Sequence, residues 1–319
     1  MSSLSPGAYS TRRSRTLSQL RDIESKARYR CREVSEMSIR QPRALNFYAS
    51  ECRKQEIERY LDGFQVPAEP SKIVAGVVPH AGWGFSGAVA AKVFKCIKER
   101  SSPATFILLG AIHRWGIRKN SVYANGSWLT PLGEVEVDSN IAADLLDSLQ
   151  TLLAEDPRAH SEEHSIEVQT PFIKYFFPQA MLVPIAIVPN SKSALTGQKI
   201  GKFVAENKKE IVVIGTTDLT HYGDNYGFTP QGYGPNALKW MRKNDSRIID
   251  LALDMKADSI VQEAMSNHNA CGSGAMAATV SAAKAMGAEK GILIDYTTSH
   301  DVSRESNFYM GVGYAGIVF

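Results

Sequence analysis

Short apolar runs alternate with longer amphipathic stretches along most of this chain, and this alternation is the feature that most limits its possible folds. Nearly unbroken apolar runs predict buried strands at 72–79, 105–111, 181–188 and 210–215. Helical periodicity predicts helices at about 86–99, 193–208, 234–254, 256–266 and 274–287. Strands interleaved with helices in this way predict an α/β fold, with helices flanking a mixed central sheet.

The remaining segments complete this architecture. Residues 121–138 alternate in the manner of a hairpin or an edge pair of strands. Periodicity predicts helices at 139–154 and, despite Pro171, at 163–176, and two further strands are predicted at 291–298 and 308–319. Because no linker rich in Pro, Gly or Ser follows residue 40, we predict one α/β domain over 37–319.

Charge is concentrated at the N-terminus. Residues 1–36 contain eight Arg/Lys and four Asp/Glu, so they carry +4, and the rest of the chain carries −1 of the total +3. We interpret residues 1–36 as a disordered or weakly helical extension, since they lack the apolar core of a secretory signal. The near-neutral remainder gives no electrostatic reason to expect nucleic-acid or membrane-surface binding. No apolar run approaches the roughly 18 residues needed to span a bilayer.

The cysteines indicate the compartment. Cys31, Cys52, Cys96 and Cys271 are scattered without C-x-x-C spacing, which favours a reducing, cytoplasmic location over a disulfide framework.

Polar residues of chemical interest follow the apolar runs. In α/β sheets, ligands bind beyond the carboxyl ends of the strands. His80 follows the run at 72–79, His113 follows 105–111, and Asp218 and His221 follow 210–215. A single histidine after a strand is usually structural, but several segments deliver imidazoles to the same expected edge of one sheet. The sequence therefore predicts a functional site there.

Two further segments are candidates for the same site. EEHSIEVQTPF places His164 and Glu167 three residues apart, on one face of the helix predicted at 163–176. In NACGSGAM, Cys271 stands just before a predicted helix, although a lone cysteine is more often a small buried apolar residue. We interpret His160 and His300 as structural, and the sequence leaves the role of His268 open.

Two neutral imidazoles and a thiolate form a three-ligand set with open positions, which is typical of a catalytic rather than a structural metal site. We therefore predict His80, His113 and Cys271 as metal ligands, with Fe(II) or Cu favoured and Zn also compatible with these donors. Asp218 with His221, and His164 with Glu167, are then candidates for catalytic acid–base or orienting roles. No phosphate-binding loop, dinucleotide-binding glycine motif, H-E-x-x-H or G-x-S-x-G competes with this interpretation.

At these residues the chain resembles the Memo-like family, also called AmmeMemoRadiSam system protein B. The resemblance runs from about Met37 to Phe319. It rests on these motifs in this order: SIRQPRALNFYA, VVPHAGWGFSG, LLGAIHRWG, WLTPLGEVEVD, EEHSIEVQTPF, TTDLTHYG and NACGSGAM. It implies a fold similar to the class III extradiol dioxygenases, which are non-haem Fe(II) enzymes. It also implies a metal pocket formed by His80, His113 and Cys271, beside the pairs Asp218–His221 and His164–Glu167.

Two departures weigh against simple ring cleavage. The family usually has G-P-S-H where this chain has Gly110, Ala111, Ile112 and His113, so the loop that carries His113 differs. The dioxygenases use a carboxylate as third ligand, whereas Cys271 takes that place here, and a thiolate is itself oxidisable.

Three hypotheses follow from the sequence. The first is a metal-dependent redox enzyme that uses Fe or Cu and has a dioxygenase-like fold. The second is a Zn-dependent hydrolase. The third is a non-catalytic module that binds a peptide, phosphate or partner protein. An unknown small molecule or peptide is the expected ligand. The resemblance adds AMMECR-type and radical-SAM proteins of the same bacterial system as expected partners.

Overall fold

The four apolar runs form the parallel centre of a mixed sheet in the computed structural model, which describes residues 38–319 apart from 49, 51 and 115. Strand β2 pairs with β9, β9 with β3, and β3 with β8, all parallel. Continuous apolar sequence is expected here because helices cover both faces of such strands. In the described residues the order is β10–β12–β2–β9–β3–β8–β4–β7, with β11 paired to β12.

The strands of this sheet have the following bounds: β2 Ala75–Val78, β3 Thr105–Gly110, β4 Asn120–Val122, β7 Leu153–Glu155, β8 Met181–Ala186, β9 Ile211–Thr216, β10 His221–Tyr222, β11 Ile292–Thr298 and β12 Gly311–Val318. Strand β12 is antiparallel to β2 and β11, and β4 is antiparallel to β8. The sheet is therefore mixed, and the predicted α/β class with helices flanking a mixed sheet is confirmed.

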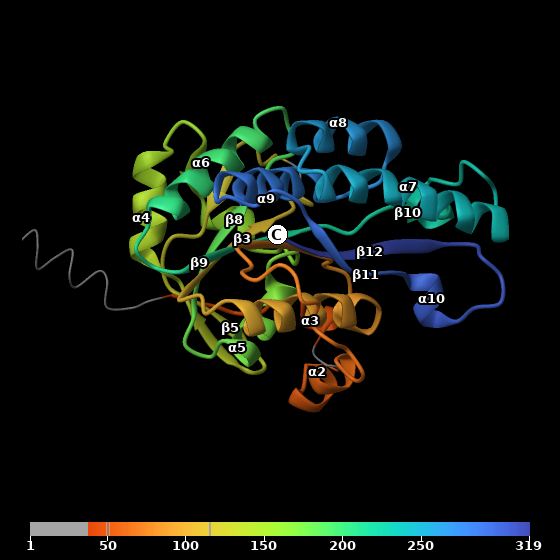
Figure 1. Ribbon diagram of the computed structural model, residues 1–319, viewed down its shortest axis with the longest axis horizontal. Helices are drawn as coiled ribbons and strands as arrows, with labels where there is room; N and C mark the ends of the chain where they lie inside the picture. Colours follow the sequence, from red (N-terminus) through yellow and green to blue (C-terminus); the bar gives the residue numbers. More distant parts are fainter. Residues whose placement is uncertain (1–37, 49, 51, 115) are drawn as a thin grey trace, which may run out of the picture. The chain divides into compact units, whose positions relative to one another are not determined.

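Helices pack on both faces of the sheet (Figure 1). One face carries α3 (Trp83–Arg100) and α5 (Thr170–Phe176), and the other carries α6 (Ser193–Glu206) and α9 (Ser273–Ala285). The remaining helices are α2 Lys54–Tyr60, α4 Ser139–Ser148, α7 Pro235–Leu253, α8 Ala257–Asn267 and α10 Ser299–Ser303, with 3-10 turns at Leu45–Phe47, Pro157–His160, Glu167–Gln169 and Asp224–Tyr226. Helices α6 and α9 approach so closely that a Cβ at Gly197 would lie 1.9 Å from the Ala278 carbonyl oxygen.

Two predicted helices are wrong in part. The helix predicted at 139–154 ends at Ser148, and 153–155 is the strand β7. The helix predicted at 163–176 begins only at Thr170, where Pro171 occupies the first turn, a position that needs no backbone N–H donor. His164 and Glu167 consequently do not share a helical face.

A segment of residues 39–48, which we call the strap, joins a small second sheet beside the candidate site. Its strand β1 (Ile39–Arg40) pairs with β5 (Ser127–Thr130), and β5 pairs with β6 (Gly133–Glu136). The predicted hairpin at 121–138 is present as β5 and β6, whereas β4 joins the main sheet. The strap ends at Tyr48 and brings Phe47 against His164, with ring centroids 4.4 Å apart.

Glu167 holds the strap in place. Its carboxylate accepts hydrogen bonds from Arg40 Nη1 at 2.7 Å, Arg43 N at 3.0 Å, Ala44 N at 2.8 Å and Tyr48 Oη at 2.8 Å. The side chain of Glu167 is only 1% exposed, so this carboxylate is committed to the strap.

Residues 39–319 form one compact unit. The predicted extension at 1–36 lies outside the described residues. In the part of the chain that the structure describes, no helix combines the length and apolar character required to cross a membrane.

His160 supplies a test of pH-dependent stability. Its ring is buried, Nε2 lies 2.9 Å from the Ser121 carbonyl oxygen, and burial lowers the pKa of His160 to about 4. The folded protein therefore favours the neutral ring, so its stabilising contribution is complete above the unfolded pKa of about 6.5 and is lost as pH falls toward 4. Glutamine retains a donor for Ser121 but does not titrate. Between pH 7.5 and pH 5 we therefore expect the free energy of unfolding of His160→Gln to fall by about 2 kcal/mol less than that of wild type.

The measurement is denaturant unfolding of both proteins at pH 7.5 and pH 5. Wild type is expected to lose about 2 kcal/mol more than His160→Gln over this interval. The exposed His268, replaced by Gln, serves as the control. Equal losses in wild type and His160→Gln would contradict the assignment.

Candidate metal centre

His80 lies directly beyond β2 and is almost completely buried, with 1% exposure. Its backbone N–H donates to Asp218 Oδ1 at 2.7 Å, which ties the end of β2 to the loop after the neighbouring strand β9. In the ring, Nδ1 lies 3.1 Å from Thr216 Oγ1 and Nε2 lies 3.1 Å from Cys271 Sγ. The contact with Thr216 fixes the orientation of the ring, so Nε2 is the nitrogen that faces the thiol. Burial, followed by the neighbouring His113 and His164, lowers the pKa of His80 well below its usual value.

His113 follows β3 and is oriented by a carboxylate that the sequence analysis did not select. Glu163 accepts from the backbone N–H of His113 at 2.8 Å, and its Oε1 lies 3.0 Å from His113 Nδ1. Glu163 is buried and also accepts from Ser165 N at 2.9 Å. This contact occupies Nδ1 and leaves Nε2 of His113 for another partner.

The electrostatics of this pair favour its charged forms. Burial opposes the charge on His113, but its hydrogen bonds with Cys271 and Glu163 prevail and raise the pKa of His113 to about 10. Burial likewise opposes ionisation of Glu163, yet the hydrogen bond and charge of His113 lower the pKa of Glu163 well below its usual range.

Cys271 stands in the turn between α8 and α9, next to both histidines. Its backbone N–H donates to the Asp218 carbonyl oxygen at 3.2 Å, which anchors this turn to the loop after β9. A Cβ at the following Gly272 would lie 2.1 Å from the Thr216 carbonyl oxygen, so this close approach requires glycine. Burial raises the pKa of the Cys271 thiol, and its hydrogen bond with His113 acts in the opposite direction.

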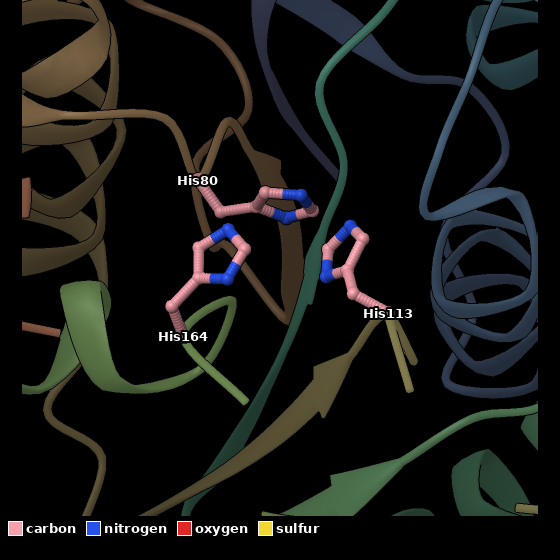
Figure 2. A group of neighbouring side chains, drawn as sticks. All are labelled: His80, His113 and His164. Atoms are coloured by element: carbon pink, nitrogen blue, oxygen red, sulfur yellow. The ribbon is translucent and has the colours of Figure 1, made fainter. Parts of the chain in front are cut away.

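His164 completes a group of three imidazoles. One ligand atom from each of His80, His113 and His164 lies within 4.8 Å of the others. Figure 2 shows the three rings gathered around a shared space, each carried by a different segment. The His164 ring packs between Phe47 and His113, with centroid distances of 4.4 and 4.8 Å. Burial, and then the charge of His113, lower the pKa of His164 to about 4.

Asp218 and His221 lie beside this group, in the loop between β9 and β10 and at the start of β10. Asp218 is buried and accepts from the backbone N–H groups of His80 and Ala81. Burial raises the pKa of Asp218 to about 7, although those backbone donors act against the increase. His221 Nδ1 lies 2.9 Å from the Leu219 carbonyl oxygen, so Nδ1 carries the proton and Nε2 is left as a base. Burial also lowers the pKa of His221.

A cavity of about 500 Å³ opens onto these side chains. Among the predicted site residues it is lined by His80, His113, His164, Asp218 and His221. Glu167 and Cys271 are not among the lining residues: Glu167 is bound to the strap, and Cys271 lies behind His80, with its Sγ 3.1 Å from His80 Nε2. His300, interpreted from the sequence as structural, also lines the cavity and packs its ring against Phe308, with centroids 5.3 Å apart. His160 and His268 are not among the lining residues.

The donor set fits a transition metal. The remaining contacts of His80 and His113 occupy Nδ1, so two Nε2 atoms and one sulfur are available in neighbouring positions. Imidazole and thiolate are donors that suit Fe, Cu and Zn, and a carboxylate on the second ring nitrogen is a usual accompaniment of a metal-binding histidine. The third imidazole, His164, provides an additional donor in reach of the same space.

Sequence reasoning missed three residues that form this centre: Glu163, Thr216 and Phe47. Glu163 precedes His164 in EEHS, but the sequence does not reveal which of two adjacent carboxylates faces inward. Thr216 could have been suspected, because it is the polar residue that ends the apolar run of β9. Phe47 gave no signal, since its role depends on where the strap is placed.

The family model and the sequence relatives agree on one family. A family model described as Memo-like protein matches residues 40–318. A MEMO1 family protein of Thermococcus onnurineus is 37% identical over 283 residues, covering 86% of this chain and 96% of that protein. A MEMO1 family protein of Archaeoglobus fulgidus is 32% identical over 285 residues, covering 88% and 99% respectively. Among solved structures, an uncharacterized protein of Escherichia coli K12 aligns with a TM-score of 0.48 and 11% identity, covering 77% of this chain and 99% of that one.

Proposed function

This chain belongs to the Memo-like protein family, and on that premise we propose that it is a metal-dependent redox enzyme that uses Fe or Cu in the cavity beside His80 and His113. The observation that carries the proposal is the distance of 3.1 Å between His80 Nε2 and Cys271 Sγ. The His113 side chain interacts with the same thiol. Nε2 of His80, Nε2 of His113 and Sγ of Cys271 would hold the ion. A bound Fe or Cu ion would supply electron transfer and Lewis acidity.

The surrounding residues support this chemistry in two ways: some orient the metal-binding histidines, and others transfer protons. Glu163 fixes the ring of His113, and Thr216 fixes the ring of His80. We assign proton transfer to His164 and His221, because both line the cavity and both have a lowered pKa, so that each is a neutral base near pH 7. Asp218 joins the His80 loop to the Cys271 turn and thereby holds the two ligand segments together.

Two aromatic rings, Phe47 in the strap and Tyr226 outside it, shield the two histidines assigned to proton transfer from water. Phe47 covers one face of the His164 ring, and Tyr226 packs its ring edge-on against His221 at a centroid distance of 5.0 Å. We assign Glu167 a positioning role, since its carboxylate fixes the strap that carries Phe47.

The proposal is tested by metal analysis of protein purified without oxygen. We expect Fe or Cu near one per chain, and a reversible change in the spectrum of the bound ion on oxidation and reduction. Stoichiometric Zn that survives Fe or Cu reconstitution would replace the redox assignment with the Zn hydrolase. Absence of any metal after reconstitution would rule out both enzymes and leave the binding module.

A further inference from the structure

Apart from His113, whose positive charge is paired with the carboxylate of Glu163, the charged side chains that line the cavity are acidic. Asp218 and Glu305 carry the carboxylates, and among the described residues no lysine or arginine lines the space. Arg304, the neighbour of Glu305, is not a lining residue. Phosphate and carboxylate ligands are normally recognised by arginine or lysine, so the walls lack the groups that such ligands need.

The apolar part of the lining is largely aromatic. Phe47, Phe85, Tyr226 and Tyr314 contribute rings, and Met310 and Val312 add apolar surface. Phe85 and Tyr226 are 47% and 43% exposed, so each presents a ring that no other part of the described chain covers fully. Aromatic faces attract organic cations, and the attraction increases when the site is partly shielded from water.

Glu305 is the group best placed to select for charge. It follows α10, whose residues Ser299, His300 and Ser303 also line the cavity. Within the described residues Glu305 forms no hydrogen bond or ion pair, so its carboxylate remains available to a ligand. The buried Asp218, in contrast, is already committed to the backbone of His80 and Ala81.

We propose that this cavity takes an organic cation, an amine or guanidinium group carried on an aromatic or apolar body, with Glu305 as the specificity-determining residue. A volume of about 500 Å³ lies in the range of small-molecule sites. The two positive charges of a divalent ion would be balanced by the thiolate of Cys271 and the carboxylate of Glu163. The carboxylate of Glu305 therefore still gives the cavity a net negative charge. The inference rests on the proposed function only in using the same cavity.

The test compares three ligands with the same body: 3-phenylpropylamine, 3-phenylpropan-1-ol and 3-phenylpropionate. Binding to the full chain is measured by isothermal titration, with and without its bound metal. We expect the amine to bind about 10-fold more tightly than the carboxylate. Glu305→Gln should reduce this preference by roughly 3-fold, and Glu305→Lys should reverse it. Ser303→Ala, in the same wall, is the matched control and should leave the preference unchanged.

A second pair of ligands identifies the source of the cation. The affinities of N-acetyl-Phe-Lys-Leu-amide and N-acetyl-Phe-Glu-Leu-amide are compared. Tighter binding of the lysine peptide shows that a lysine side chain can take the place of the free amine. Phenyl phosphate is titrated in the same way. The proposal is overturned if the carboxylate or phenyl phosphate binds more tightly than the amine, or if the amine binds no more tightly than the alcohol. It is also overturned if the preference is unchanged in both Glu305 variants. The two proposals can fail separately. An amine preference in metal-free protein supports the cation site even if the metal assignment is wrong, and a bound metal supports the metal assignment even if the amine is not preferred.

Discussion

Replacement of His113 by alanine is expected to lower metal affinity by about 100-fold or more, since loss of an orienting partner alone typically costs about 10–100-fold. The substitution removes an Nε2 donor and also leaves Glu163 without its main partner. Competition against a chelator of known affinity gives the dissociation constant for wild type and variant. His113 is partly exposed, with 36% of its side chain accessible, so the variant is expected to fold.

Glu163→Gln provides the graded comparison. Glutamine retains the shape and can still accept from the backbone N–H of His113, but it removes the negative charge beside Nδ1. We expect a loss of about 10–100-fold in metal affinity, smaller than the loss from His113→Ala. His300→Ala is the control, because it removes an imidazole from the same cavity without removing a proposed ligand. Unchanged metal affinity in His113→Ala would show that the ligand assignment is wrong.

Replacement of Glu167 by alanine is expected to destabilise the protein by about 3–5 kcal/mol, because it leaves the buried Arg40 guanidinium without its anion. The same change removes the acceptor for Ala44 N and Tyr48 Oη, so the strap loses its main attachment. For a chain of this size the loss corresponds to a decrease of roughly 4–9 °C in Tm. Thermal unfolding followed by circular dichroism measures it.

The control for this experiment is Glu162→Ala, which removes a nearby carboxylate whose side chain is 73% exposed. We expect its Tm to stay within about 1–2 °C of wild type, as is usual for surface substitutions. A Glu167→Ala variant as stable as Glu162→Ala would contradict the role assigned to the strap. Limited proteolysis adds a local readout, since cleavage within 39–48 should accelerate in Glu167→Ala alone.

The strands were the most predictable part of the fold. Residues 106–109 and 211–214 are apolar throughout because each strand is covered on both faces, and burial leaves little choice of side chain. The start of α5 was not predictable from periodicity, because His164 to Val168 fit a helical pattern but fold as a loop and a 3-10 turn. The apolar spacing in this segment reflects side chains that are buried on several sides, not one buried face of a helix.

The amino-acid sequence by itself determined the α/β architecture and the edge of the sheet at which His80, His113 and Asp218 emerge, because apolar runs specify buried strands and strands end where polar residues begin. Only the tertiary structure decided which partner each side chain took. Glu163 faces His113, Glu167 faces the strap, and Phe47 covers His164. These contacts join segments more than 45 residues apart, and pairings over such separations depend on how loops cross in space rather than on any local pattern.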